Sequence, residues 1–483
     1  MASRRKFLTA AAGLTILPSA RTAWAYEANE RLNLAVFGTL YNSAHMLAAP
    51  HLHDAPIVAL CDPDTRAIDK AKKQWVEIAA GLESDDKPEN RRWAENYRRM
   101  ARGDGVKIYT DIRKLMDEMG DLIDALVVSQ YDHLHGIACG PALRAGKPVL
   151  SERPLGMNIS DARSLRTLAA EMGLPTTYRS PGTAMGPFRR AIELAEDGLL
   201  GDVKEVHIWF QRGGPDRRAL PEGTEPVPDG LDWDSWLGPL PWRGYHPDWM
   251  AYSHWRETCN GGLGVFGAHT IILPFLTLKM RTLWDREAGA EPIRVTAECS
   301  SLNGVSFPRW ERVRWEIPAR GDLTPVTVTW HHGPDFAPGT RELIHGKMRE
   351  FGVDSADAAD ALMKDAGSML VGSAGALVGN DHSTDVTALP STKFDEIETR
   401  RPLRIPAGEN IYRDWIGACR GKDTHIVADF DHGGPLSELL MIGNIATLYP
   451  EETLSYDPAE GRFSNKPEAN DRLGFTYRDG WRI

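Results

Sequence analysis

Cysteine is scarce in this sequence, and its few occurrences follow no regular spacing. The 483 residues include five cysteines, at Cys61, Cys139, Cys259, Cys299 and Cys419. An odd and scattered set argues against a disulfide framework, and no group of cysteine and histidine has the spacing of a zinc site. His331 and His332 are adjacent instead of one helical turn apart, so we expect them at the end of a strand. The sequence therefore predicts no metal centre.

Positive charge and long apolar runs are also in short supply. The chain has 56 Lys and Arg against 67 Asp and Glu, a formal net charge of −11. An acidic surface disfavours nucleic acid and anionic membranes as partners. After residue 25 no segment is long and apolar enough to span a bilayer. A content of 42% hydrophobic and 25% charged residues is typical of a globular chain, and the length predicts two domains.

The N-terminal residues have the pattern of an export signal. Arg4 and Arg5 precede a short apolar stretch at 8–18, and Ala23-Trp24-Ala25 offers a small-x-small cleavage site. Paired arginines in this position are typical of the twin-arginine signal, which engages the twin-arginine export machinery. We therefore expect residues 1–25 to be removed and the mature protein to be periplasmic or otherwise exported. That route carries proteins already folded, often with a cofactor in place.

Residues 31–153 alternate between strand-like and helix-like segments. Short, nearly continuous apolar runs occur at 32–37, 56–62, 106–110, 123–129 and 147–152, with helical periodicity at 111–119 and 135–145. Such runs are typical of strands buried on both faces of a parallel sheet. The pattern predicts an α/β Rossmann domain, a doubly wound parallel sheet whose site lies at the carboxyl ends of the strands. The charged stretch 77–103 is interpreted as a solvated helical insertion.

Residues 154–483 follow a different pattern. Helices are expected at 161–172, 187–197, near 269, at 411–419 and at 435–448, and strands at 175–180 and 203–211. Period-two alternation at 293–302, 313–317 and 326–330, without intervening helices, favours antiparallel strands. The sequence thus predicts a C-terminal α+β domain with a large, mostly antiparallel sheet. An irregular segment rich in Pro, Gly and Trp occupies 212–260.

The loop after the first predicted strand is a reduced dinucleotide loop. In F-G-T-L-Y-N-S-A-H only Gly38 survives of the glycines of G-x-G-x-x-G, and Leu40 and Ser43 replace the others. Asp62 ends the second strand near the offset of a carboxylate that accepts ribose hydroxyls, which favours NAD over NADP. Asp62 is equally compatible with an ordinary strand-end or helix-cap aspartate. The loop residues expected to contact a nucleotide are Gly38, Thr39, Leu40, Tyr41 and Asn42.

The segment SQYDHLH follows the fourth strand. Ser129 and Tyr131 are expected to face the cofactor, and Asp132 to cap the next helix. His133 and His135 either contact the cofactor or pack at the start of that helix.

These pieces and later motifs together resemble one protein family. The matching motifs are VFG (36–38), CD (61–62), the aspartate and histidines of YDHLH (131–135), AGK (145–147), ERP (152–154), GLDWDSWLGP (230–239), YHPDW (245–249), GGLGVFGAHT (261–270) and PEANDRL (467–473). Over nearly the whole mature chain the sequence resembles the Gfo/Idh/MocA oxidoreductases, which include glucose–fructose oxidoreductase and inositol dehydrogenase. It looks most like their exported branch.

The resemblance implies a homo-oligomer that binds NAD and a small carbohydrate, with Glu152 and Arg153 beside the cofactor. The family lysine of Glu-Lys-Pro corresponds to Arg153, and its aspartate and histidine to Val265 and His269. A further frequent acid corresponds to Ile272. Arg153 stays protonated, so it can stabilise an alkoxide but hardly relay a proton, whereas His269 can serve as acid and base.

The Trp-rich segment suggests how a sugar is held. Stacking and hydroxyl recognition suit the residues Arg179, Tyr245, His246, Trp255 and Arg256, together with His269. Arg179 is also compatible with an ordinary solvated arginine at a strand end. Trp233 and Trp236 are instead expected to pin the loop to the core. Val265 and Ile272 would form an apolar wall that favours a deoxygenated, acylated or aryl-substituted sugar.

Two functions remain open at this point. The first is an exported NAD(H)-dependent oxidoreductase acting on a sugar or sugar derivative, with its NAD tightly bound. The second is a catalytically silent carbohydrate-binding or scaffold protein that keeps the fold, which the lost glycines, lysine and aspartate favour.

Overall fold

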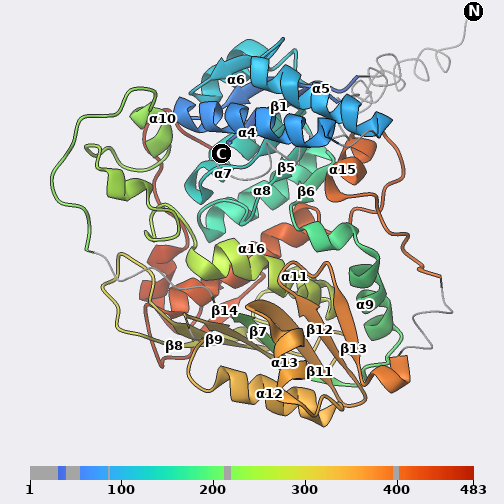
Figure 1. Cartoon of the computed structure of the whole chain (residues 1–483). Coiled ribbons are helices and arrows are strands. Elements are labelled where there is room, and N and C mark those ends of the chain that lie inside the picture. The colour runs from blue at the N-terminus through green and yellow to red at the C-terminus, as the bar shows by residue number, and fades with distance from the viewer. Residues whose placement is uncertain (1–30, 40–54, 85–86, 212–218, 335, 395–401) are drawn as a thin grey trace, which may run out of the picture.

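The computed structural model describes residues 31–39, 55–84, 87–211, 219–334, 336–394 and 402–483. The predicted signal peptide and the loop residues Leu40, Tyr41 and Asn42 lie outside these ranges. Two sheets organise the described residues, one above the other in Figure 1.

The first sheet is parallel and six-stranded, in the order β3-β2-β1-β4-β5-β6. Its strands are β1 (Leu34–Phe37), β2 (Ile57–Cys61), β3 (Lys107–Tyr109), β4 (Ala125–Val128), β5 (Val149–Ser151) and β6 (Thr176–Tyr178). This confirms the doubly wound Rossmann sheet. The sixth strand lies beyond residue 153, so the sheet extends past the proposed domain boundary.

Alternation along β1 explains why helices cover both faces. Leu34 and Val36 are buried against α4 (Thr65–Glu83), α5 (Pro88–Arg102) and α15 (Ile411–Cys419). Ala35 and Phe37 are buried against α6 (Ile112–Met119), α7 (Asp132–Arg144) and α8 (Ile159–Met172). Side chains of a strand point alternately to opposite faces, so a continuous apolar run satisfies both layers. In the charged stretch 77–103, residues 77–83 belong to α4 and residues 88–102 form α5, so these described parts are helical, as expected.

The second sheet has nine strands and is mostly antiparallel, in the order β13-β12-β11-β7-β10-β9-β8-β14-β15. Its strands are β7 (Val203–Phe210), β8 (Ile293–Cys299), β9 (Glu311–Ile317), β10 (Val326–His332), β11 (Ala366–Gly372), β12 (Ala376–Asn380), β13 (Val386–Leu389), β14 (Leu454–Asp457) and β15 (Arg462–Phe463). Only the described pair β7–β10 is parallel. The predicted α+β domain is confirmed, and His331 and His332 end β10 as expected.

Helices α11 (Ala268–Thr277) and α16 (Phe430–Ala446) lie between the two sheets in Figure 1. The remaining described α-helices are α9 (Gly186–Glu196), α10 (Trp233–Leu237), α12 (Thr340–Glu350) and α13 (Ala356–Met363). α16 begins five residues before the predicted start, because the carboxylate of Asp429 accepts a hydrogen bond from the His432 backbone N–H and caps the helix.

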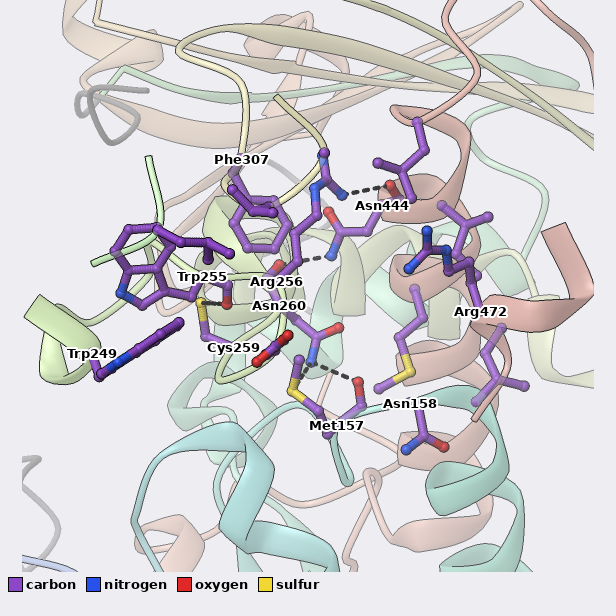
Figure 2. A pocket seen from close by; sticks show the side chains of 18 residues that line it. Met157, Asn158, Trp249, Trp255, Arg256, Cys259, Asn260, Phe307, Asn444 and Arg472 are labelled. Atoms are coloured by element: carbon purple, nitrogen blue, oxygen red, sulfur yellow. Dashed lines mark hydrogen bonds between the residues drawn. The ribbon is translucent and has the colours of Figure 1, made fainter. Parts of the chain in front are cut away.

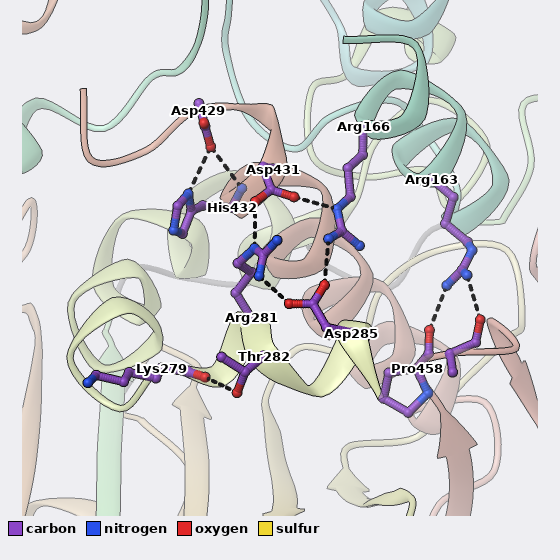
Figure 3. Close-up of polar contacts among 11 residues, drawn as sticks. Arg163, Arg166, Lys279, Arg281, Thr282, Asp285, Asp429, Asp431, His432 and Pro458 are labelled. Atoms are coloured by element: carbon purple, nitrogen blue, oxygen red, sulfur yellow. Dashed lines mark hydrogen bonds and ion pairs between the residues drawn. The ribbon is translucent and has the colours of Figure 1, made fainter. Parts of the chain in front are cut away.

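Ion pairs connect α16, which lies between the two sheets, to α8, which covers the first sheet. Arg166 of α8 and Arg281, which follows α11, both bind the carboxylate of Asp431 in α16, at 2.9 Å and 2.6 Å (Figure 3). Arg163 of α8 binds the carbonyl oxygens of Pro458 and Ala459. Three segments far apart in sequence are thereby held beside one another.

Candidate functional site

The carboxyl ends of β1, β2 and β4 bring four predicted cofactor residues together. Gly38 has φ +102°, and a Cβ there would overlap the carbonyl oxygen of Ser129, so only glycine fits. The Asp62 carboxylate accepts hydrogen bonds from the Thr39 N–H at 2.8 Å and the Thr39 hydroxyl at 2.7 Å. The buried Ser129 hydroxyl has no hydrogen-bond partner among the described residues. This edge, where the strand order reverses beside β1, is where doubly wound sheets bind nucleotides.

Tyr131, His133 and His135 lie at the start of α7 and are buried. The Tyr131 hydroxyl donates to the Met250 carbonyl oxygen. The ring nitrogens of His133 lie 2.8 Å and 3.2 Å from the Trp236 and Thr258 carbonyl oxygens, and those of His135 face the Pro154 and Gln130 carbonyl oxygens. Burial lowers the pKa of both histidines to about 4. These contacts join the start of α7 to the second domain. His133 and His135 therefore pack at the start of the helix, which is the second of the two roles considered for them.

Asp132 is the first residue of α7 and does not cap it from outside, contrary to the sequence interpretation. Its Oδ2 accepts a hydrogen bond from the Asn260 N–H at 2.7 Å, while Oδ1 has no partner among the described residues. Burial raises the pKa of Asp132 to about 7, against the lowering effects of Asn260 and of the Arg153 charge. The carboxyl group is thus a buried link between the two domains.

We expect Asp132→Asn to change how stability depends on pH. A carboxyl group with a raised folded-state pKa stabilises the fold fully below its unfolded pKa, near 4, and this stability is lost as pH rises through about 7. The free energy of unfolding of Asp132→Asn relative to wild type should therefore rise with pH between those values, by at most about 1.4 kcal/mol per pH unit. Urea unfolding across the pH range measures it, with exposed Asp229→Asn as the control for removing a charge. A pH-independent difference would contradict the expectation.

Glu152, Arg153 and Arg179 form a buried charge triad at the ends of β5 and β6. The Glu152 carboxylate pairs with Arg153 and, at 3.0 Å, with Arg179. Arg179 also donates from Nε to the Tyr412 hydroxyl at 2.8 Å. Side-chain exposure is 1% for Glu152, 12% for Arg153 and 10% for Arg179, so the triad carries one net positive charge in a largely dry setting.

His269 lies in α11 within the field of this triad. It is buried, and neither ring nitrogen has a hydrogen-bond partner among the described residues. Burial, followed by the charges of Arg153, His382 and Arg179, holds the pKa of His269 well below its usual range. The imidazole is therefore neutral at pH 7, with one nitrogen able to donate and the other to accept a hydrogen bond.

The segment before His269 carries a π-helical turn, Leu263–Gly267. Such turns occur frequently at functional sites because they rotate neighbouring side chains out of α-helical register. Val265 is half-buried within the turn, but Ile272 is 1% exposed and packs in the core. The apolar wall of Val265 and Ile272 stays a prediction.

The Trp-rich segment is divided between two tasks. The rings of Trp233 and Trp236 stack 4.7 Å apart and pack near Tyr131, so they pin the loop to the first domain as expected. Tyr245 is buried edge-on against Trp233. The His246 side chain accepts a hydrogen bond from the Asp248 N–H and caps a short 3₁₀ turn.

Trp255 and Arg256 line a cavity of about 320 Å³, shown in Figure 2. Arg256 donates to the carbonyl oxygens of Ser306 and Asn444 and to the Thr447 hydroxyl. Burial lowers its pKa to about 10. The cavity shares no lining residue with the group around His269, which comprises Arg153, Arg179, Phe266 and His382. The structure thus separates the six predicted substrate residues into three pairs. Arg179 and His269 lie near the charge triad, Tyr245 and His246 lie in the segment beside Trp233, and Trp255 and Arg256 line the cavity.

Sequence reasoning missed His382, whose ring centroid is 4.5 Å from that of His269. It lies between β12 and β13, a hairpin that the pattern did not predict, so no local signal pointed to it. Asn260, Asn444 and Arg472, which line the cavity, were also missed. All five thiols are free. Within the described ranges, no cluster of three or more His, Cys, Asp or Glu could hold a metal ion, and none of the helices found there is long and apolar enough to cross a membrane.

Comparison with known sequences connects the first domain to one family. Residues 32–179 match the sequence model GFO_IDH_MocA, described as an oxidoreductase family with an NAD-binding Rossmann fold. An uncharacterized oxidoreductase of Schizosaccharomyces pombe is 32% identical over 107 residues, 22% of this chain and 28% of that protein. Inositol 2-dehydrogenase of Gluconacetobacter diazotrophicus is 30% identical over 125 residues, 24% of this chain and 35% of that enzyme. The matches thus span about a third of these relatives' length.

A solved structure extends the likeness to both sheets. The WlbA dehydrogenase of Bordetella pertussis, in complex with NADH and UDP-GlcNAcA, aligns with a TM-score of 0.53 over 87% of this chain and 97% of that chain. The sequence identity is 12%, so this likeness concerns the fold alone.

Proposed function

We propose that this protein is an exported NAD(H)-dependent oxidoreductase acting on a sugar or sugar derivative, because residues 32–179 match the model of the Gfo/Idh/MocA oxidoreductase family with its NAD-binding Rossmann fold. In this proposal it crosses the membrane folded, by the twin-arginine route, and works as a homo-oligomer. Free nicotinamide nucleotide should be scarce outside the cytoplasm. The cofactor would therefore stay bound while two substrates alternate, or while a transient ketone forms and is reduced again.

The proposal rests on one observation, the two unpartnered ring nitrogens of the buried His269. A buried polar group without a partner is costly, and such groups mark sites where a ligand or a reaction completes the bonding. His269 has two such nitrogens among the described residues and lies in the field of Arg153 and Arg179. A substrate hydroxyl placed there can donate its proton to the neutral imidazole, while the nearby positive charge stabilises the oxygen left behind.

The residues at the sheet edge fit NAD. Gly38 supplies the close backbone approach, and Ser129 supplies a free hydroxyl within the described region. Asp62, with Thr39 held against it, would accept the ribose hydroxyls. When bound, NAD supplies a hydride acceptor, or in its reduced form a donor. The chain's own contribution is to orient the nucleotide at β1 and to hold the proton at His269.

We expect protein purified from the periplasmic fraction to release NAD(H) when it is denatured, and the emptied protein to bind NADH more tightly than NADPH. The physical reason is Asp62, whose carboxylate would repel a 2′-phosphate. Chromatography of the denatured supernatant and calorimetry with both nucleotides measure these outcomes. Tighter binding of NADPH would refute the role of Asp62, and absence of the protein from the periplasm would refute export.

A second candidate function is a silent carbohydrate-binding or scaffold protein. The observation that favours it concerns Arg153, which stands at the position where the family's lysine would relay a proton. Arg153 instead forms an ion pair with Glu152. Release of NAD(H) without turnover of any sugar in a broad screen would support this alternative.

A further inference from the structure

We propose that the cavity between the Trp-rich segment and α16 is a second binding site, for a small carboxylate that carries an aromatic or apolar body and a hydroxyl group. The cavity is lined by residues 157–159, the segment 249–260, the loop 304–307 and the C-terminal half of α16 with Leu448, together with Leu220 and Arg472. Its volume of about 320 Å³ lies at the lower end of the range for small-molecule sites and is too small for a dinucleotide.

The walls favour an aromatic or apolar body. Trp249 and Trp255, with ring centroids 5.5 Å apart, lie on one side of the cavity in Figure 2, with Phe307 above them. Met441 and Ile445 of α16 also line the cavity, and all five of these side chains are at least nine-tenths buried. A flat apolar group inserted among them would gain stacking and desolvation.

Charge favours an anion. The guanidinium of Arg256 lies over the ring of Phe307, 4.6 Å from its centroid, and already donates to three chain oxygens, so it contributes charge and holds the wall. Arg472 is exposed on the opposite side, within electrostatic range of Arg256, and no carboxylate pairs with it in the described part of the chain. Glu257 on the rim is neutralised by Arg243 at 2.6 Å. The charged residues that line the cavity are thus two arginines, Arg256 and Arg472, and one paired glutamate, Glu257.

Two buried amides supply the polar groups. Asn158 uses Oδ1 to accept from the Asp161 N–H, which leaves its Nδ2 donor without a partner among the described residues. Asn444 uses Nδ2 to donate to the Asn260 carbonyl oxygen, which leaves its Oδ1 acceptor without a partner in the same set. Because these bonds fix the orientation of both amides, one donor and one acceptor remain for a ligand. A carboxylate matches the donor and Arg472, and a hydroxyl matches the acceptor.

Calorimetry with 3-phenyllactate tests the proposal, using its uncharged amide and lactate as ligand controls. We expect saturable binding of phenyllactate at millimolar concentration or below, and weaker binding of both control ligands. Arg472→Gln should weaken phenyllactate binding about 10-fold or more, because it removes a charge-assisted hydrogen bond. Arg144→Gln, an exposed arginine on α7, should leave binding unchanged.

Phe307→Leu keeps an apolar wall but removes the ring, and should reduce the preference for phenyllactate over lactate. No saturable binding, equal binding of the amide, or unchanged affinity in Arg472→Gln would overturn the proposal. Because the experiment needs neither NAD nor turnover, its outcome is independent of the proposed oxidoreductase activity.

Discussion

Replacing Glu152 with alanine is expected to lower the free energy of unfolding by about 3–5 kcal/mol, since it leaves two buried guanidinium groups without their shared carboxylate. Arg153 and Arg179 both pair with Glu152, and all three side chains are at most 12% exposed. Neither arginine can lose its proton at ordinary pH, so the uncompensated charge must be hydrated by opening the site or tolerated at high cost. Urea unfolding of wild type and variant measures the change.

The matched control for that experiment is Glu83→Ala. Glu83 pairs with Arg98 on the surface between α4 and α5, where the side chains are 42% and 37% exposed. Water and salt screen such a pair, so we expect little change in stability. Glu152→Gln keeps the shape of the side chain and a hydrogen-bond acceptor, so its loss in free energy of unfolding should lie between those of Glu152→Ala and Glu83→Ala. If Glu152→Ala is as stable as Glu83→Ala, the triad does not hold this edge of the sheet together.

Replacing His269 with alanine is expected to reduce turnover of a sugar by about 10²–10⁴-fold while leaving bound NAD(H) unchanged. The reason is that, in the described part of the chain, both ring nitrogens of His269 are buried without a hydrogen-bond partner. Its pKa is held well below 6.5, so the acid limb of the pH–rate profile in wild type should also fall below 6.5. Absorbance of the reduced nicotinamide, followed with a panel of sugars, measures the turnover and its dependence on pH.

Two further variants make the His269 experiment specific. His432→Ala alters a histidine that bonds to Asp429 away from the site, and should retain turnover. Arg153→Lys should preserve or raise turnover, because lysine keeps the positive charge and can also exchange a proton. Unchanged turnover in His269→Ala would remove this histidine from the proposed mechanism.

The fold was largely predictable because its strongest signals are local. Runs such as 32–37 and 123–129 are apolar at every position, which only a strand buried on both faces or a buried helix tolerates, and their length favours a strand. The hairpin β11–β12–β13 was not predicted, because Gly372, Gly375 and Gly379 interrupt it and weaken the strand pattern. Packing requires glycine at Gly372, where a Cβ would overlap the Leu200 carbonyl oxygen, and at Gly375, where it would press on Phe394, while a Cβ at Gly379 would only be tight against Leu273.

The site was predictable only in part, for a geometrical reason. His269 follows Arg256 by 13 positions in the sequence, and both were assigned to one pocket. The π-helical turn lies between them and His269 is the second residue of α11, so Arg256 donates to a carbonyl oxygen of α16 while His269 is in the field of Arg153 and Arg179. His382 reaches His269 from a distant hairpin. Such contacts depend on tertiary structure and leave no trace in local spacing.

The placement of α15 has a consequence for how the chain is made. Tyr412, Trp415 and Ile416 belong to the same apolar core as Leu34 and Val36, so one face of the first sheet is covered by residues from near the other end of the sequence. A ribosome adds roughly 5–20 residues per second, so the first sheet waits on the order of tens of seconds for this cover. During that interval the newly made segment exposes the part of this sheet face that α15, and not α4 or α5, covers in the finished protein. A chaperone that shields apolar surfaces should therefore bind nascent chains that end shortly before Ile411, and release those that extend beyond Cys419.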